Sequence, residues 1–378
     1  MRVLMISYTS LLQRAYRAKC SEICRQGDVD LTVLTPESWR EAWSPTGRVD
    51  FEPENGREPY GSIRAPILFA GNGHISFFRR GLGRAISEVR PDVIDLEREP
   101  WSFASGQVLW LRRRHCPRAR LVFHASQTLM KRYPPPFRQI EQSVFRRADA
   151  ALARSEAAAT VLRRRGFGGR VRVIPHGVDT QTFSPAVPPA GGDPVVGFVG
   201  ALTVQKGVAT LLEALARLGP GVRCVIVGDG PERGRLETLA RKLGIGRKVE
   251  FAGALPHARI PAVLRGMSVF VLPAQTVPGC QERFGRVLAE AMATGLPVVG
   301  TDSGEIPNVI GDAGLVVPER DAEALARALG EIVADREKAR ALGARARHRV
   351  EENFGWGVVA RRTLEVYREV LAAEVRDR

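Results

Sequence analysis

The sequence predicts an α/β protein of two domains, each built around a parallel β-sheet. A chain of 378 residues is longer than one ordinary hydrophobic core can serve. Short apolar runs alternate with helical stretches, and a segment rich in Pro and Gly, residues 180–194, interrupts this alternation before it starts afresh. Strands separated by helices favour parallel sheets, which bind ligands at the carboxyl ends of their strands.

In the first half, apolar runs predict buried strands at residues 3–6, 31–34, 93–96, 121–124 and 150–153. Apolar side chains recur at near-helical spacing among arginines in the segment before Pro91, which predicts a helix. The proline predicts that this helix ends before residue 91. These side chains are Phe78, Leu82, Ile86 and Val89. The stripe favours a crossover helix that covers the sheet. An amphipathic helix lying on an anionic membrane is the alternative.

The second half repeats the pattern, with strands expected at residues 195–199, 223–227, 249–251, 269–272 and 296–300. Helices are expected near residues 207–218, 232–243 and 322–333. Asp321 is placed to cap the last of these helices. A final helix near residues 358–375 can reach back to the first domain.

Composition places the chain among soluble globular proteins, with 44% hydrophobic and 26% charged residues. No apolar run approaches the ~20 residues needed to cross a bilayer. The apolar start, Met1–Ser7, is too short for a signal peptide and is expected to be the first strand. Five scattered cysteines without metal-ligand spacing favour reduced thiols. A cytoplasmic location is therefore expected.

The formal net charge of +15 is the unusual feature of the composition, and arginine carries most of it. An arginine-rich surface attracts phosphates, whether these belong to nucleotides, anionic lipids or nucleic acid. A general compositional bias towards arginine is the plainer explanation, and the charge alone does not decide between the two.

One stretch combines an anion site with two carboxylates. After the strand at 269–272, a helix can begin at about Gly285, whose missing side chain lets backbone N–H groups approach a ligand closely. The free N–H groups and the positive end of the helix dipole suit a diphosphate. Glu282 precedes this helix and Glu290 lies inside it. These carboxylates can accept hydrogen bonds from the hydroxyls of a sugar and a ribose.

The stretch resembles the signature of the family 4 glycosyltransferases. The pattern is Glu-x-Phe-Gly-x4-Glu from Glu282 to Glu290, continued by Ala-Met-Ala-x-Gly-x-Pro-Val-Val and then by Gly-Glu-Ile-Pro at 304–307. The resemblance extends over most of the chain. Further matching segments are residues 90–94, 148–149, 155–156, 173–179, 198–200, 206–207 and 227–231.

The resemblance implies a GT-B fold, in which two Rossmann-like domains face each other across a cleft. Residues 1–185 would form the acceptor-binding domain and residues 186–357 the nucleotide-sugar-binding domain, with residues 358–378 returning to the first. It also implies transfer with retention. No metal or other cofactor is expected, because Lys206 and the helix start at Gly285 already supply positive charge and no aspartate pair at metal-binding spacing lies beside them. The donor would be a nucleotide-diphosphate sugar, with UDP- or GDP-sugars expected, and the acceptor a hydroxyl on a glycan precursor, a lipid carrier or a secondary metabolite.

By the same resemblance, Glu282 contacts the hydroxyls of the donor sugar, Glu290 holds the ribose, and Lys206 neutralises the diphosphate. His124 matches a histidine that lies beside the transferred sugar in relatives; a hydrogen-bonded structural histidine at a strand end is the alternative. The predicted catalytic residues are therefore Glu282, Lys206 and His124. The predicted donor-binding residues are Gly200, Lys206, Glu282, Arg283, Phe284, Gly285, Arg286, Val287 and Glu290.

Two departures from the family pattern affect these expectations. Ala201 stands where the family usually has a phosphate-binding arginine, and the loop that begins at residues 7–12 lacks the family's glycines. One hypothesis is that Arg283 or Arg286 supplies the charge missing at position 201. The alternative is that both arginines project into solvent.

Two other functional classes are alternatives to sugar transfer. A catalytically inactive protein that binds polyanions or a membrane surface would explain the arginine runs at 112–114 and 163–165. However, helices are expected at both runs, and neither is interleaved with aromatic residues, so nucleic acid is not an expected partner. Peripheral contact with an anionic membrane at the inner face stays open. A sugar phosphorylase or nucleotide-sugar epimerase on the same scaffold is a further alternative.

Overall fold

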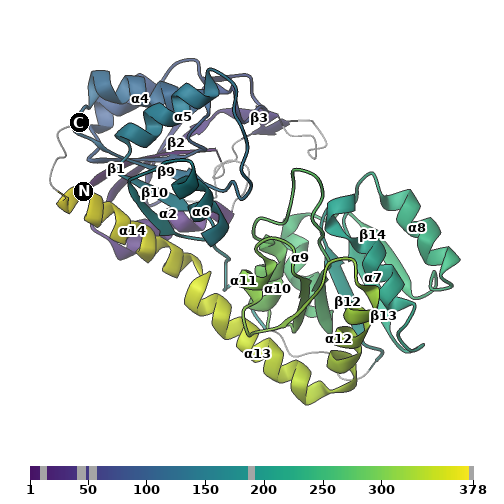
Figure 1. Cartoon of the computed structure of the whole chain (residues 1–378). Helices are drawn as coiled ribbons and strands as arrows, with labels where there is room; N and C mark the ends of the chain where they lie inside the picture. The colour runs from purple at the N-terminus through teal and green to yellow at the C-terminus, as the bar shows by residue number, and fades with distance from the viewer. Residues whose placement is uncertain (9–14, 41–47, 51–57, 186–191, 374–378) are drawn as a thin grey trace. The chain divides into compact units, whose positions relative to one another are not determined.

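The computed structural model describes residues 1–8, 15–40, 48–50, 58–185 and 192–373. It divides the chain into two compact units, which are described separately (Figure 1). Unit 1 comprises Met1–Gly177 together with Trp356–Arg378, and unit 2 comprises Val178–Gly355. The domain boundary expected at 185/186 borders residues 186–191, which lie outside the described part of the chain. Most of the first-strand loop expected at 7–12 also lies outside it.

Unit 1 contains a seven-stranded parallel sheet in the order β11-β10-β9-β8-β1-β2-β5. In that order the strands are Arg170–Val173, Ala150–Ala153, Arg120–Ala125, Val93–Glu97, Arg2–Ser7, Asp30–Pro36 and Gly61–Ala65. Two short antiparallel pairs accompany the sheet: β3 (Ser38–Arg40) with β4 (Arg48–Asp50), and β6 (Ile67–Leu68) with β7 (Phe77–Phe78). The five strands expected in this half are confirmed as β1, β2, β8, β9 and β10.

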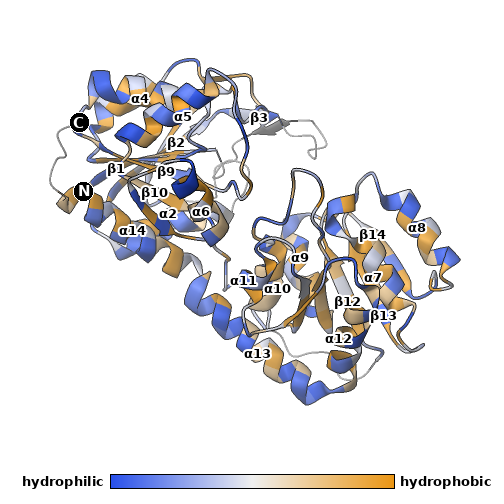
Figure 2. Cartoon of the chain, viewed as in Figure 1, coloured by the Kyte–Doolittle hydropathy of each residue, from blue (hydrophilic) through white to orange (hydrophobic). Residues whose placement is uncertain are grey.

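Helices cover both faces of this sheet, as the alternation along β1 shows. Leu4 and Ile6 join a core formed with α3 (Leu82–Val89), α4 (Phe103–His115), α5 (Phe137–Arg147) and α6 (Glu156–Arg164). Val3 and Met5 point to the other face, which packs against α2 (Ala15–Gln26) and α14 (Trp356–Ala372). Burial on both faces explains why residues 3–6 of β1 are all apolar. Figure 2 shows these hydrophobic strands inside the polar surface of the helices.

The apolar stripe before Pro91 belongs to a crossover helix. Leu82 and Ile86 are fully buried in the core of unit 1, so they cannot face a membrane. Phe78 was wrongly assigned to this helix, because it lies in β7. Gly81, with a φ of 91°, separates the two elements, and this left-handed conformation prevents the helix from extending back across it. No helix in the described part of the chain is long and apolar enough to span a bilayer.

Unit 2 contains a six-stranded parallel sheet in the order β14-β13-β12-β15-β16-β17. In that order the strands are Val249–Gly253, Arg223–Val227, Val195–Val199, Val269–Leu272, Val298–Thr301 and Leu315–Val317. Its helices are α7 (Val208–Leu215), α8 (Arg233–Lys242), α9 (Ile260–Arg265), α10 (Arg286–Ala293), α11 (Ile306–Ile310), α12 (Ala322–Ala334) and α13 (Arg336–Asn353). Two 3₁₀ turns, η1 (Val204–Lys206) and η2 (His257–Arg259), complete it.

The local expectations for unit 2 hold at most positions. Strands β12, β13 and β15 have the predicted bounds, and the Asp321 side chain caps α12 by accepting the N–H of Ala324 at 2.8 Å. The strand expected from Leu296 begins two residues later, at Val298, because Pro297 lacks the N–H that a ladder needs. Strand β17 and helix α13 were not anticipated.

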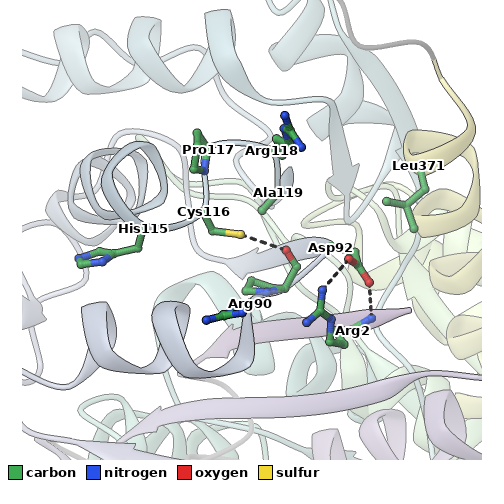
Figure 3. A pocket seen from close by; sticks show the side chains of 10 residues that line it. Arg2, Arg90, Asp92, His115, Cys116, Pro117, Arg118, Ala119 and Leu371 are labelled. Carbon is green, nitrogen blue, oxygen red and sulfur yellow. Dashed lines mark hydrogen bonds and ion pairs between the residues drawn. The ribbon is translucent and has the colours of Figure 1, made fainter.

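A cavity of about 430 Å³ opens at the amino ends of β1, β8 and β9 in unit 1 (Figure 3). Arg2, Arg90 and Arg118 contribute to its lining, and Arg2 pairs with Asp92 at 3.3 Å. This edge is opposite to the carboxyl ends of the strands, where parallel sheets usually bind substrates.

Helix α14 joins unit 1 through a buried hydrogen bond. The Tyr367 hydroxyl donates to Asp95 Oδ2 at 2.5 Å, and both side chains are fully buried. On the helix surface, Glu369 accepts from Arg172 at 2.9 Å. The tyrosine therefore ties α14, the last helix among the described residues, to the middle of the unit 1 sheet.

We expect Tyr367→Phe to destabilise the protein by about 1–3 kcal/mol, because it removes a hydrogen bond to a buried carboxylate while keeping the aromatic packing. Urea unfolding measures the change. Tyr60→Phe is the matched control, since the structure records no hydrogen bond to its hydroxyl among the described residues. Equal stability of the two variants would contradict the importance of the Tyr367 contact.

Candidate functional site

An ion pair joins the ends of the two central strands of unit 2. Lys206 lies in η1, just after β12, and Glu282 lies in the loop after β15; these strands are neighbours in the sheet. Lys206 Nζ donates to Glu282 Oε2 at 2.6 Å. The other carboxylate oxygen, Oε1, accepts the backbone N–H groups of Arg283 at 3.2 Å and Gly285 at 3.1 Å. Glu282 is therefore held at both oxygens.

Glycines allow the loops around this pair to approach each other. Gly285, with a φ of 73°, starts α10, and a Cβ there would lie 2.7 Å from Leu272 Cδ2. Gly304 packs against the Glu282 backbone, where a Cβ would come within 2.0 Å of the carbonyl oxygen. Gly207, with a φ of 65°, would bring a Cβ within 1.8 Å of the Pro273 carbonyl oxygen. Larger residues at these positions would push the site loops apart.

Glu290 lies on α10 and is almost completely buried. Its Oε1 lies 3.0 Å from His257 Nε2 and 3.4 Å from Arg286 Nε. His257 comes from η2, after β14, and was not anticipated, because it belongs to none of the recognised motif segments. Only the fold brings it to the carboxylate, 33 positions away in sequence.

The remaining predicted donor-binding residues surround the same sheet edge. Phe284 is buried, Val287 and Gly200 are half-buried, and Arg283 is exposed. Ala201 is also exposed and follows β12. Arg286 contacts Glu290, so it is not simply a solvated side chain. Whether Arg283 or Arg286 replaces the family arginine stays a prediction.

His124 lies in unit 1, at the end of β9, inside a buried network of charges. Its Nε2 lies 2.7 Å from Asp95 Oδ1, and Arg154 donates to its Nδ1 at 2.7 Å. Because a guanidinium can only donate, Nδ1 must accept and Nε2 must carry the proton. The structure therefore holds His124 as a neutral imidazole with both ring nitrogens bonded, as expected of a hydrogen-bonded structural histidine at a strand end. Its contact with a transferred sugar stays a prediction.

The charges of this network balance one another. Burial is the largest influence on His124 and lowers its pKa; Asp95 opposes the shift and Arg154 adds to it. Burial alone would raise the pKa of Glu97, but the positive charges of Lys19 and Arg154 outweigh it and hold that pKa well below its usual range. Lys19 donates to Glu97 Oε1 at 2.8 Å.

The same network offers three atoms that a metal ion could use. Ligand atoms of Asp95, Glu97 and His124 lie within 4.8 Å of one another. Lys19, Arg154 and Tyr367 already bond these side chains, and the two cations neutralise the carboxylates. The donor set therefore does not fit a metal, because a cation would have to displace Lys19 or Arg154.

Comparisons with known proteins identify the family. The family model described as Glycosyl transferases group 1 matches residues 179–349, and the model described as Glycosyltransferase Family 4 matches residues 20–182. D-inositol 3-phosphate glycosyltransferase of Corynebacterium urealyticum is 31% identical over 302 residues, which cover 70% of this chain and 69% of the relative. The chain belongs to glycosyltransferase family 4.

Other similar proteins agree with this assignment. Alpha-maltose-1-phosphate synthase of Mycolicibacterium smegmatis is 36% identical over 228 residues, and the match spans 54% of this family 4 chain and 58% of the relative. The solved structure of HepE from Anabaena, in complex with UDP, matches with a TM-score of 0.75 at 19% identity. This match covers 98% of this chain and all of HepE. The fold is GT-B, with a Rossmann-like parallel sheet in each unit.

We expect Gly207→Ala to lower the stability of this family 4 protein by at least about 2 kcal/mol. The new Cβ would overlap the Pro273 carbonyl oxygen, and alanine tolerates a positive φ poorly. Thermal unfolding measures the effect. Gly219→Ala is the control, because a Cβ there meets nothing within 4 Å. If both variants have the same melting temperature, the close approach of the two loops is not required for stability.

Proposed function

We propose that this chain is a glycosyltransferase that moves a sugar from a nucleotide-diphosphate sugar, with UDP- or GDP-sugars expected, to a hydroxyl acceptor. Transfer proceeds with retention and without a metal or other cofactor. The observation that carries the proposal is the Lys206–Glu282 pair beside the start of α10, in a chain of this family. HepE, which shares the fold, was solved with UDP.

The pair places a cation, Lys206, beside a carboxylate, Glu282, that can accept hydrogen bonds from sugar hydroxyls. A lysine ammonium has three donors, and Glu282 uses one of them, so the others can bind a diphosphate. The start of α10 adds backbone donors, and among the described residues none accepts the N–H of Val287. Together they supply the positive charge that a departing diphosphate requires. Glu282, on the same loop, then orients the hydroxyls of the sugar.

The hydrogen bonds of Glu282 favour an orienting role over that of a general base. Both of its oxygens already accept bonds, from Lys206 and from two backbone N–H groups. In the proposed mechanism the departing phosphate instead takes the proton of the acceptor hydroxyl on the same face of the sugar. The new glycosidic bond forms as the bond between sugar and diphosphate breaks, and configuration is retained.

The rival functions have less support. In the basic-binder alternative the arginine runs would bind polyanions, yet Arg112 donates to the Ala119 carbonyl at 2.6 Å and Arg165 donates to Glu141 at 2.8 Å. Both runs lie at the carboxyl ends of helices, where cations complement the helix dipole.

A panel of UDP- and GDP-sugars with candidate hydroxyl acceptors tests the proposal. Release of nucleoside diphosphate with a new glycoside of retained anomeric configuration supports it; epimerised donor or salt-sensitive polyanion binding alone refutes it.

Glu282→Gln should reduce transfer by at least about a hundredfold while the protein stays folded, because the amide no longer pairs with Lys206 and leaves the sugar misplaced. Steady-state kinetics with the active donor measures the loss. Glu323→Gln, on the surface of α12, is the control. Near-wild-type turnover of Glu282→Gln would remove this carboxylate from the mechanism.

Transfer should survive an excess of EDTA. Lys206 and the start of α10 take the electrostatic part that a divalent cation plays in other transferases. Rates are compared before and after chelation and gel filtration. Loss of activity that Mg²⁺ or Mn²⁺ restores would show that the diphosphate is neutralised in another way.

A further inference from the structure

Glu290 presents two chemically different oxygens. His257 hydrogen-bonds to Oε1 at 3.0 Å and Arg286 forms an ion pair with the same oxygen at 3.4 Å, whereas the structure records no hydrogen bond from a described residue to Oε2. A carboxylate oxygen accepts about two hydrogen bonds, so Oε1 is already engaged by two groups while Oε2 keeps its full capacity. The carboxylate is thus anchored through one oxygen and available through the other.

His257 is placed to fix this orientation. It lies in η2, and its ring packs against Phe183 with the centroids 5.5 Å apart. Its side chain is 49% exposed, whereas that of Glu290 is 6% exposed. The imidazole therefore spans the distance from the protein surface to a buried carboxylate. Arg286 reaches Glu290 from the same helix, one turn earlier, so the two contacts approach from different elements.

We propose that His257 is a positioning residue for nucleotide recognition: with Arg286 it engages Oε1 of Glu290 and directs Oε2 to the ribose hydroxyls of the donor. This inference rests on the proposed function. Without His257, Arg286 is the only described partner of Glu290, and its guanidinium can take both oxygens in a bidentate pair. The ribose would then compete with an arginine for the same atoms.

The experiment compares nucleotides with and without the hydroxyls in question. Calorimetry measures the binding of UDP and GDP, and of their 2′,3′-dideoxy forms, to the full chain and to three variants. His257→Ala removes the anchor. His257→Gln places an amide N–H near the position of Nε2. Arg259→Ala, in the same turn, is the control, because the structure records no contact between Arg259 and Glu290.

We expect His257→Ala to weaken binding of the ribonucleotide roughly tenfold, the scale of one charge-assisted hydrogen bond, and to leave binding of the dideoxy form unchanged. His257→Gln should recover much of the loss, and Arg259→Ala should match the wild type. In steady-state kinetics, His257→Ala should raise KM for the donor more than it lowers kcat.

Other outcomes distinguish a failure of the proposed function from a failure of the proposed role of His257. Wild-type protein that binds neither UDP nor GDP contradicts the proposed function and the inference with it. Wild-type protein that prefers ribonucleotides, combined with a His257→Ala variant of unchanged affinity, overturns the inference alone. Equal weakening for the ribose and dideoxy forms overturns it as well, because the effect would then be a general distortion of unit 2.

Discussion

The candidate site depends on one interaction, the ion pair between Lys206 and Glu282. It links the segments that follow two adjacent parallel strands, β12 and β15, at the edge of the unit 2 sheet. Each partner is also constrained by its own loop: Lys206 by a 3₁₀ turn that ends at Gly207, and Glu282 by two backbone N–H groups before α10. Contacts within the protein therefore bring a cation, a carboxylate and a helix start together. This preorganisation is what a site that stabilises a departing anion requires.

The two units handle buried charge in different ways. In unit 1, Lys19 and Arg154 neutralise Asp95 and Glu97 inside the sheet edge, and Tyr367 adds a hydrogen bond from the last helix. Burying an unpaired charge costs several kcal/mol, and the buried charges of this network pair with one another. In unit 2, by contrast, the structure records no hydrogen bond from a described residue to one oxygen of Glu290, and Lys206 is partly exposed. The open network is the better candidate for binding a ligand.

The sequence predicted much of the fold because its strands are short and largely apolar, and several of them have Gly or Pro at one end. β12, β13 and β15 were located to the residue for this reason. Phe78 was misplaced because apolar spacing alone does not show that Gly81 breaks the helix. His257 could not be found, since its role depends on a contact between η2 and α10 that no local pattern encodes. The pairing of Lys206 with Glu282 likewise required the strand order, which places β15 beside β12.

The most direct test of this account is calorimetric binding of UDP and GDP to the wild-type chain and to Lys206→Ala. Lysine removal takes a charged donor from the diphosphate and leaves the Glu282 carboxylate without its cation. Affinity should therefore fall about ten- to a hundredfold, with the fold intact. Lys242→Ala, an exposed lysine on α8, should bind like the wild type. Unchanged nucleotide affinity in Lys206→Ala would contradict the account, because the diphosphate would then bind somewhere other than the junction of β12 and β15.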